Sequence, residues 1–106
     1  MISFEDFSKL DLRIGKILEI AEHPNADKLY VLKVDIGEKT IQLVAGIRQY
    51  YEPSQLKDKL IVVITNLEPR TVRGVESQGM LLAAQSQSTI AVLSPEKEVP
   101  AGSRIG

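Results

Sequence analysis

Two arginines that lie three residues apart, Arg70 and Arg73, are the side chains of this chain best suited to binding chemistry. Each guanidinium is a planar, permanently charged fork of N–H donors that matches the oxygens of a phosphate group. Ser77 and Gln78 follow closely and offer polar groups that can reach phosphates or sugar hydroxyls. The alternative is that the arginines form surface ion pairs with neighbouring glutamates, which contribute little. No nucleophile lies beside a general base, so the segment indicates nucleic-acid binding rather than catalysis.

Several other chemistries are excluded by composition and spacing. The chain has no cysteine, which rules out disulfides, thiolate metal sites and cysteine catalysis. The one histidine, His23, precedes Pro24 and is predicted to be a turn residue rather than a metal ligand. Gly74 and Gly79 have the spacing of a phosphate-binding P-loop, but Met80 follows where that motif requires lysine. Both glycines are instead expected in turns that need positive φ. We therefore predict no metal, no cofactor and no catalytic residue.

Five further side chains are candidates for contact with a nucleic acid. Most of them lie at or near the ends of apolar stretches, where loops bring polar groups to the surface, whereas Lys33 lies at a less apolar position within the predicted strand 30–36. Each has an ordinary structural alternative, because a strand lysine is often only solvated, an asparagine often caps a turn and a methionine often packs in a core. These candidates, which join the two arginines, Ser77 and Gln78, are Lys28, Lys33, Arg48, Asn66 and Met80.

Composition is that of a single globular domain spanning residues 1–106. Apolar residues make up 43% and charged residues 25% of the chain, and the net charge is −1. Any basic surface must therefore be local. The longest apolar run, 60–64, is too short to span a bilayer, and the N-terminus lacks the features of a secretory signal. We expect a cytoplasmic protein without a membrane partner.

Hydrophobic alternation with a period of two predicts a chain made mainly of strands. A short helix is expected at 3–7, with Ser3 as its cap, and another is expected after Pro53. A bulge or bend is expected at Gly15 and Lys16, where the alternation is interrupted. The predicted strands cover 12–20, 30–36, 40–47, 60–67, 79–84 and 89–93.

This order of elements predicts an all-β fold with short helices. A small antiparallel sheet with a helix between its third and fourth strands is the layout of a five-stranded Greek-key OB-fold barrel. An SH3-like barrel and a ferredoxin-like sheet are the alternatives, and the latter needs two long helices that this sequence does not offer. The barrel core is predicted over about 11–93, with a C-terminal extension at 94–106.

Three segments also resemble a known family. They are His-Pro-Asn-Ala-Asp-Lys-Leu-Tyr at 23–30, Val-Ala-Gly-Ile at 44–47, and the segment 66–83, which includes Asn-Leu-Glu-Pro-Arg and Arg-Gly-Val-Glu-Ser-Gln-Gly-Met. Together they resemble the OB-fold tRNA-binding domain found at the C-terminus of methionyl-tRNA synthetases, as a stand-alone protein and in synthetase cofactors. The resemblance extends over nearly the whole chain.

The resemblance implies a non-catalytic protein that binds tRNA by its shape. It further implies a homodimer that takes part in protein biosynthesis, either alone or as the tRNA-binding subunit of a methionyl-tRNA synthetase. An export-chaperone branch of similar fold binds polypeptide and provides the competing function. The dimer surface is expected at the N-terminal segment and the tail, where apolar residues would otherwise have little to pack against. These residues are Phe4, Phe7, Val92, Leu93, Val99 and Ile105.

Overall fold

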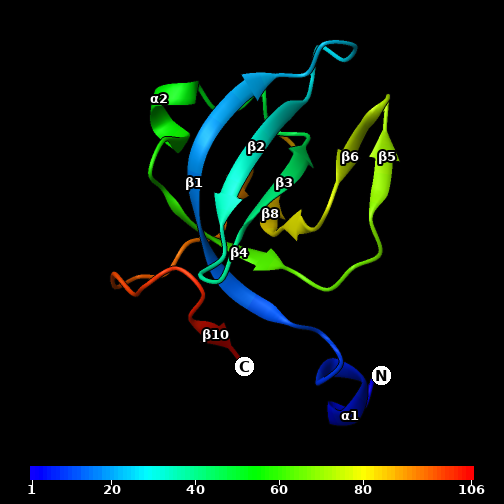
Figure 1. Ribbon diagram of the computed structural model, residues 1–106, viewed down its shortest axis with the longest axis vertical. Helices are drawn as coiled ribbons and strands as arrows, with labels where there is room; N and C mark the ends of the chain where they lie inside the picture. The colour runs from blue at the N-terminus through cyan, green and yellow to red at the C-terminus, as the bar shows by residue number, and fades with distance from the viewer.

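A computed structural model describes all residues, 1–106, and shows a small antiparallel barrel with extensions at both ends (Figure 1). The helices are α1 (Phe4–Phe7) and α2 (Pro53–Leu56). The strands are β1 (Leu12–Glu22), β2 (Tyr30–Asp35), β3 (Thr40–Ala45), β4 (Leu60–Ile64), β5 (Arg70–Val72), β6 (Val75–Ser77), β7 (Met80–Leu81), β8 (Ala83–Gln85), β9 (Ile90–Val92) and β10 (Arg104–Ile105). Each of the two helices has only four residues, so neither could span a membrane.

The barrel is formed by a sheet in the order β3-β2-β1-β4-β7, all antiparallel, with α2 connecting β3 to β4. Strand β1 is its centre, because it pairs with β2, with β4 and, at its start, with β10. The predicted alternation is confirmed in β2 and β3, whose inward side chains are buried while the intervening ones are partly exposed. The fully buried core residues are Ile17, Leu32, Val34, Leu43, Leu56, Ile61 and Val63.

Side chains complete the barrel between β3 and the segment that precedes β7. The backbone N–H of Gln78 donates to the carbonyl of Gln42 (2.8 Å), and the N–H of Gln42 donates to Oε1 of Gln78 (2.7 Å). The N–H of Val44 donates to Oγ of Ser77 (3.0 Å), which in turn donates to the carbonyl of Gly79 (3.0 Å). The nearly closed five-stranded barrel has the OB-fold arrangement, as predicted.

The irregularity in β1 lies further along the strand than predicted. The pairing of β1 with β2 shifts between Ile17 and Glu19, whereas Gly15 remains in register opposite Ile61 of β4. A Cβ atom at Gly15 would lie 2.5 Å from Cγ1 of Val34. The glycine is therefore required by close packing inside the barrel, and the expected bulge at Gly15 and Lys16 was wrong.

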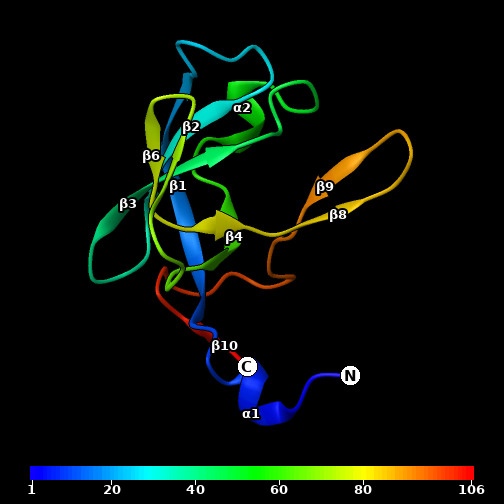
Figure 2. The same ribbon diagram turned by 90° about the vertical axis from the view of Figure 1, so that its right-hand side faces the viewer.

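Two hairpins depart from the predicted elements. The predicted strand 79–84 is divided into β7 and β8, and the strand predicted to end at 67 stops at Ile64. The pair β8–β9 forms a ribbon that projects from the barrel (Figure 2). The pair β5–β6 forms a second hairpin within the segment expected to be a loop.

Val92 of β9 belongs to the core, with 8% of its surface exposed, so its expected place on a dimer surface was wrong.

The N- and C-terminal segments lie together at one end of the molecule (Figure 1). Oγ of Ser3 accepts a hydrogen bond from the N–H of Asp6 (3.0 Å), which confirms the predicted helix cap. Phe4 and Phe7 stand with ring centroids 6.5 Å apart on a helix that contributes no buried residue. The C-terminal strand β10 pairs with the first residues of β1.

Candidate nucleic-acid interface

The hairpin β5–β6 stands beside the barrel wall and carries Arg70 and Arg73, two of the three candidate arginines (Figure 1). Its two-residue turn is made by Arg73 and Gly74, with φ of 52° and 87°. Two consecutive positive φ values are the mark of a type I′ turn, which favours glycine at the second position. The positive φ predicted for Gly74 is therefore confirmed. The β-branched residues Val72 and Val75 on either side of Arg-Gly were the sequence signal for this hairpin.

Neither arginine side chain is engaged within the protein. The side chains of Arg70 and Arg73 are exposed and form no ion pair, although Glu68 and Glu76 are near in sequence. The ion pairs considered as an alternative are absent. Two guanidinium groups on one small hairpin are therefore free to bind an anion from solution.

A groove of about 500 Å³ separates this hairpin from the loop that connects β1 to β2. Exposed Lys28 belongs to the loop wall, and Arg73 belongs to the hairpin wall. The structure therefore brings together two of the predicted residues that are 45 positions apart in the chain. One carboxylate, that of Asp27, also lines the groove, so the local charge is only mildly positive. The full lining is Asn25, Ala26, Asp27, Lys28, Leu29, Val72 and Arg73.

His23 joins the two walls of this groove. The ring is buried, with 4% of the residue exposed. Its Nδ1 accepts a hydrogen bond from the N–H of Asn25 (2.9 Å), so the proton of the neutral ring resides on Nε2 and is donated to the carbonyl of Val72 (2.9 Å). The structure thus places His23 at the turn where it was predicted. Sequence reasoning missed its bond to the hairpin, which depends on contact between residues 49 positions apart.

A second hollow of about 140 Å³ lies at the base of the hairpin, where Arg70 pairs with Ser77. Arg70 and Met80 line it together with apolar side chains and with Glu68. Met80 has 46% of its surface exposed, so the core-packing alternative for this residue is absent. A guanidinium beside an exposed thioether and an exposed Leu67 can contact both a phosphate and the face of a sugar or base.

Gly79 contributes to this hollow for a steric reason. Its φ is not positive, which corrects the expectation for this residue. A Cβ atom at Gly79 would lie 2.7 Å from the carbonyl oxygen of Ile64 and 3.2 Å from a methyl group of Leu43. The glycine therefore lets the chain pass close to β4 and β3 as it enters β7.

Four predicted residues near the hairpin already have partners within the protein. The buried Ser77 and the side chain of Gln78 close the barrel, as described above. Nζ of Lys33 donates to Oε1 of the neighbouring Gln42 (2.6 Å). The guanidinium of Arg48 pairs with Oε2 of Glu22 (2.8 Å) and donates to the carbonyl of Ala26 (3.4 Å). A ligand would have to compete with these bonds, so their contact with RNA stays a prediction.

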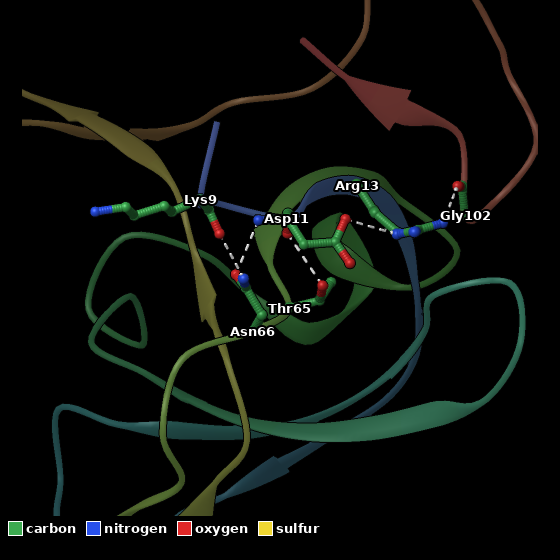
Figure 3. Close-up of polar contacts among 6 residues, drawn as sticks. All are labelled: Lys9, Asp11, Arg13, Thr65, Asn66 and Gly102. Atoms are coloured by element: carbon green, nitrogen blue, oxygen red, sulfur yellow. Dashed lines mark hydrogen bonds and ion pairs between the residues drawn. The ribbon is translucent and has the colours of Figure 1, made fainter. Parts of the chain in front are cut away.

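Asn66 lines neither the groove nor the hollow, and its amide connects the N-terminal segment to the end of β4 (Figure 3). Oδ1 accepts from the N–H of Asp11 (2.8 Å), and Nδ2 donates to the carbonyl of Lys9 (2.7 Å). The same cluster holds the Asp11–Arg13 ion pair (2.9 Å). The hydrogen bond from Arg13 lowers the pKa of the Asp11 carboxyl below its ordinary value, against a smaller opposing effect of desolvation. Asn66 therefore links two segments that are more than 50 positions apart rather than capping a turn, and its contact with RNA stays a prediction.

Comparisons with known proteins agree with this geometry. The model of a family described as a putative tRNA-binding domain matches residues 12–104. The methionine–tRNA ligase of Pyrococcus horikoshii is 55% identical over 104 residues, which are 98% of this chain and 14% of that protein. A MetRS-related protein from Pyrococcus horikoshii has a similar structure, with a TM-score of 0.93 and 30% identity over 100% of this chain and 98% of that chain. The chaperone CsaA of Bacillus anthracis also has a TM-score of 0.93, with 34% identity over 100% of this chain and 99% of that one.

Proposed function

The chain belongs to the putative tRNA-binding domain family, and we propose that it binds tRNA at the β5–β6 hairpin without catalysing a reaction. One observation carries this proposal. Arg70 and Arg73 are exposed and without ion pairs on a structured hairpin, and Arg73 faces Lys28 across a groove. Cations held on ordered backbone bind phosphates at a lower entropic cost than cations on a disordered tail.

The distribution of charge supports recognition of shape rather than of sequence. Few free cations surround the hairpin, and the whole chain has a net charge of −1. Structured RNA is recognised mainly through its phosphates, 2′-hydroxyls and overall shape, because side chains cannot enter its deep major groove. The hairpin and the loop 23–29 provide a pair of walls for such contacts, in the region where OB folds bind oligonucleotides.

The similarity to methionine–tRNA ligases supports a role as an accessory to aminoacylation. The chain spans about a seventh of the length of the ligase relatives it matches, so the ligase activity itself does not transfer to it. We infer that the domain increases the local concentration of tRNA at a methionyl-tRNA synthetase, either as a subunit or as part of it. This role belongs to protein biosynthesis in the cytoplasm.

An apolar surface at the end that holds the termini supports a homodimer. Ile2 and Phe4 have 74% and 82% of their surfaces exposed, and Leu10 is also exposed. A small hollow lies between α1 and β10, lined in part by Phe4 and Ile105. Large apolar side chains gathered in one region are typical of an interface. A second copy of the chain would cover them.

Binding of tRNA can be tested with the double variant Arg70→Ala/Arg73→Ala. We expect the Kd for labelled tRNA to rise at least about tenfold, because each charged hydrogen bond to phosphate contributes about 1.5–3 kcal/mol. The slope of log Kd against log salt concentration should become shallower by about two, because two phosphate contacts are lost. The melting temperature should hardly change, because both side chains are exposed.

The matched control is Lys39→Ala/Lys97→Ala, which removes the same charge from exposed positions outside the groove and the hollow. Tight binding by the arginine variant together with weak binding by the lysine control would locate the RNA surface elsewhere. Loss of equal size in both variants would show that only net charge matters.

A second candidate function is binding of unfolded polypeptide. The similarity to the chaperone CsaA supports it, as do the exposed Leu67 and Met80 beside the hairpin. The observations favour tRNA, because the identity to the ligase relative is 55% and that to the chaperone is 34%. Competition of labelled tRNA with a reduced, unfolded protein distinguishes the two. Displacement of tRNA by polypeptide at similar concentrations would support a shared surface.

A further inference from the structure

We propose that His23 is a positioning residue for RNA binding, because it holds the β5–β6 hairpin against the β1–β2 loop and so fixes the distance between Arg73 and Lys28. The proposal rests on the proposed function. It assigns no contact with RNA to the histidine itself, whose ring is almost fully buried.

The outer half of the hairpin has few attachments to the rest of the protein. The base of β6 is fixed to β3 through Gln42, whose Nε2 donates to the carbonyl of Glu76 (2.8 Å), and through Ser77. Residues 72–74 are tied to the rest of the chain by two hydrogen bonds, both from the loop. Nε2 of His23 donates to the carbonyl of Val72, and Nδ2 of Asn25 donates to the carbonyl of Arg73 (3.3 Å).

His23 controls both of these bonds. One ring nitrogen makes the shorter bond to the hairpin, and the other accepts the backbone N–H of Asn25. The bond from the Asn25 N–H to His23 fixes the position of Asn25, whose side chain donates to the carbonyl of Arg73. Loss of the imidazole would therefore release the hairpin directly through Val72 and indirectly through Asn25.

The opposite wall of the groove is braced independently. Arg48 pairs with Glu22 and donates to the carbonyl of Ala26, and its N–H donates to the carbonyl of Lys28 (3.4 Å). The loop that carries Lys28 therefore has its own anchor on β1 and on the segment that follows β3. The hairpin depends on His23 for its place relative to that loop. Fixing two cations before the ligand arrives lowers the ordering cost of binding.

A double-mutant cycle in tRNA affinity tests the proposal. His23→Ala should weaken tRNA binding about tenfold in the wild-type chain. In the Lys28→Ala/Arg73→Ala background the same substitution should change the Kd by less than about twofold, because the two cations whose distance His23 fixes are gone. His23→Gln should recover part of the affinity, since its amide N–H can still donate to Val72.

Amide hydrogen exchange provides a readout that does not depend on RNA. Protection of the Asn25 N–H should be lost in His23→Ala, whereas the amides of β1 and β2 should stay protected. Val92→Ala, which opens a small cavity in the core far along the chain, is the control for general destabilisation. It should change the Kd by less than about twofold.

The outcomes separate the two proposals. If the wild-type chain binds tRNA and His23→Ala weakens binding by the same factor with and without the two cations, the histidine acts through general stability and the positioning role is wrong. Unchanged affinity in His23→Ala would overturn it as well. If the wild-type chain fails to bind tRNA, the proposed function is wrong and the positioning role falls with it.

Discussion

Asp11 shows how one residue can make stability depend on pH. The hydrogen bond from Arg13 lowers the pKa of the folded-state carboxyl below its ordinary value of 3.8. A depressed pKa contributes stability that is present above the ordinary pKa and is lost as the pH falls through the lowered one. We expect the melting temperature of the wild type to fall below about pH 4, and Asp11→Asn to reduce that fall.

The measurement is a series of thermal melts from pH 7 to pH 2, with Glu98→Gln on the exposed tail as the control. At pH 7 the Asp11→Asn chain should melt at a lower temperature than the wild type, because a neutral amide accepts a weaker hydrogen bond from Arg13. If the melting temperature falls by the same amount in acid in the wild type and in Asp11→Asn, the acid sensitivity comes from other carboxylates.

Residue types revealed which side chains could bind a phosphate but not which were free to do so. The side chains of Arg70 and Arg73 have no partner in the protein, whereas those of Ser77 and Asn66 form hydrogen bonds with the backbone. Nothing in the sequence distinguishes these cases, because the partners of Ser77 and Asn66 lie 33 and 55 positions away. The hydrogen bond of His23 to Val72 was not predicted for the same reason, because the two residues lie 49 positions apart.

The side chain of Ser77 helps to close the barrel by connecting β3 to the segment before β7. Oγ of Ser77 accepts from Val44 on β3 and donates to Gly79 ahead of β7. Ser77→Ala would leave a backbone N–H without a partner, at a cost of about 1–3 kcal/mol. We expect the melting temperature to drop by several degrees, as measured by circular dichroism, with the exposed Ser88→Ala as control. An unchanged melt with weaker tRNA binding would instead make Ser77 an RNA ligand.

Long elements were predicted well and short ones poorly. Alternation over six or more residues identified β1, β2 and β3, because one face of each is buried in the core. Hairpins of three-residue strands, such as β5–β6, contain too little pattern to show a period. The irregularity in β1 was wrongly predicted at Gly15. The sequence does not show that this position needs a glycine because a Cβ atom there would collide with Val34.

Association is the prediction that belongs to the whole molecule. A second copy should cover Phe4 and its apolar neighbours, since burial of one such side chain contributes about 1.5–3 kcal/mol. Sedimentation at micromolar concentration should give twice the chain mass of 11.7 kDa. Phe4→Asp should give the single-chain mass, whereas Tyr50→Asp, an exposed aromatic away from the termini, should not. A wild-type monomer would contradict the proposed dimer.

The pairing of the first strand with the last has a consequence for how the chain acquires its structure. Leu12 and Arg13 of β1 face Ile105 and Arg104 of β10, and the same stretch pairs with β4. During synthesis from the N-terminus, β1 therefore waits for residues that emerge far later before its pairing is complete. Contacts of such long sequence separation slow folding and leave strand edges exposed in the meantime. The nascent chain is most vulnerable to wrong pairing until about its hundredth residue has left the ribosome.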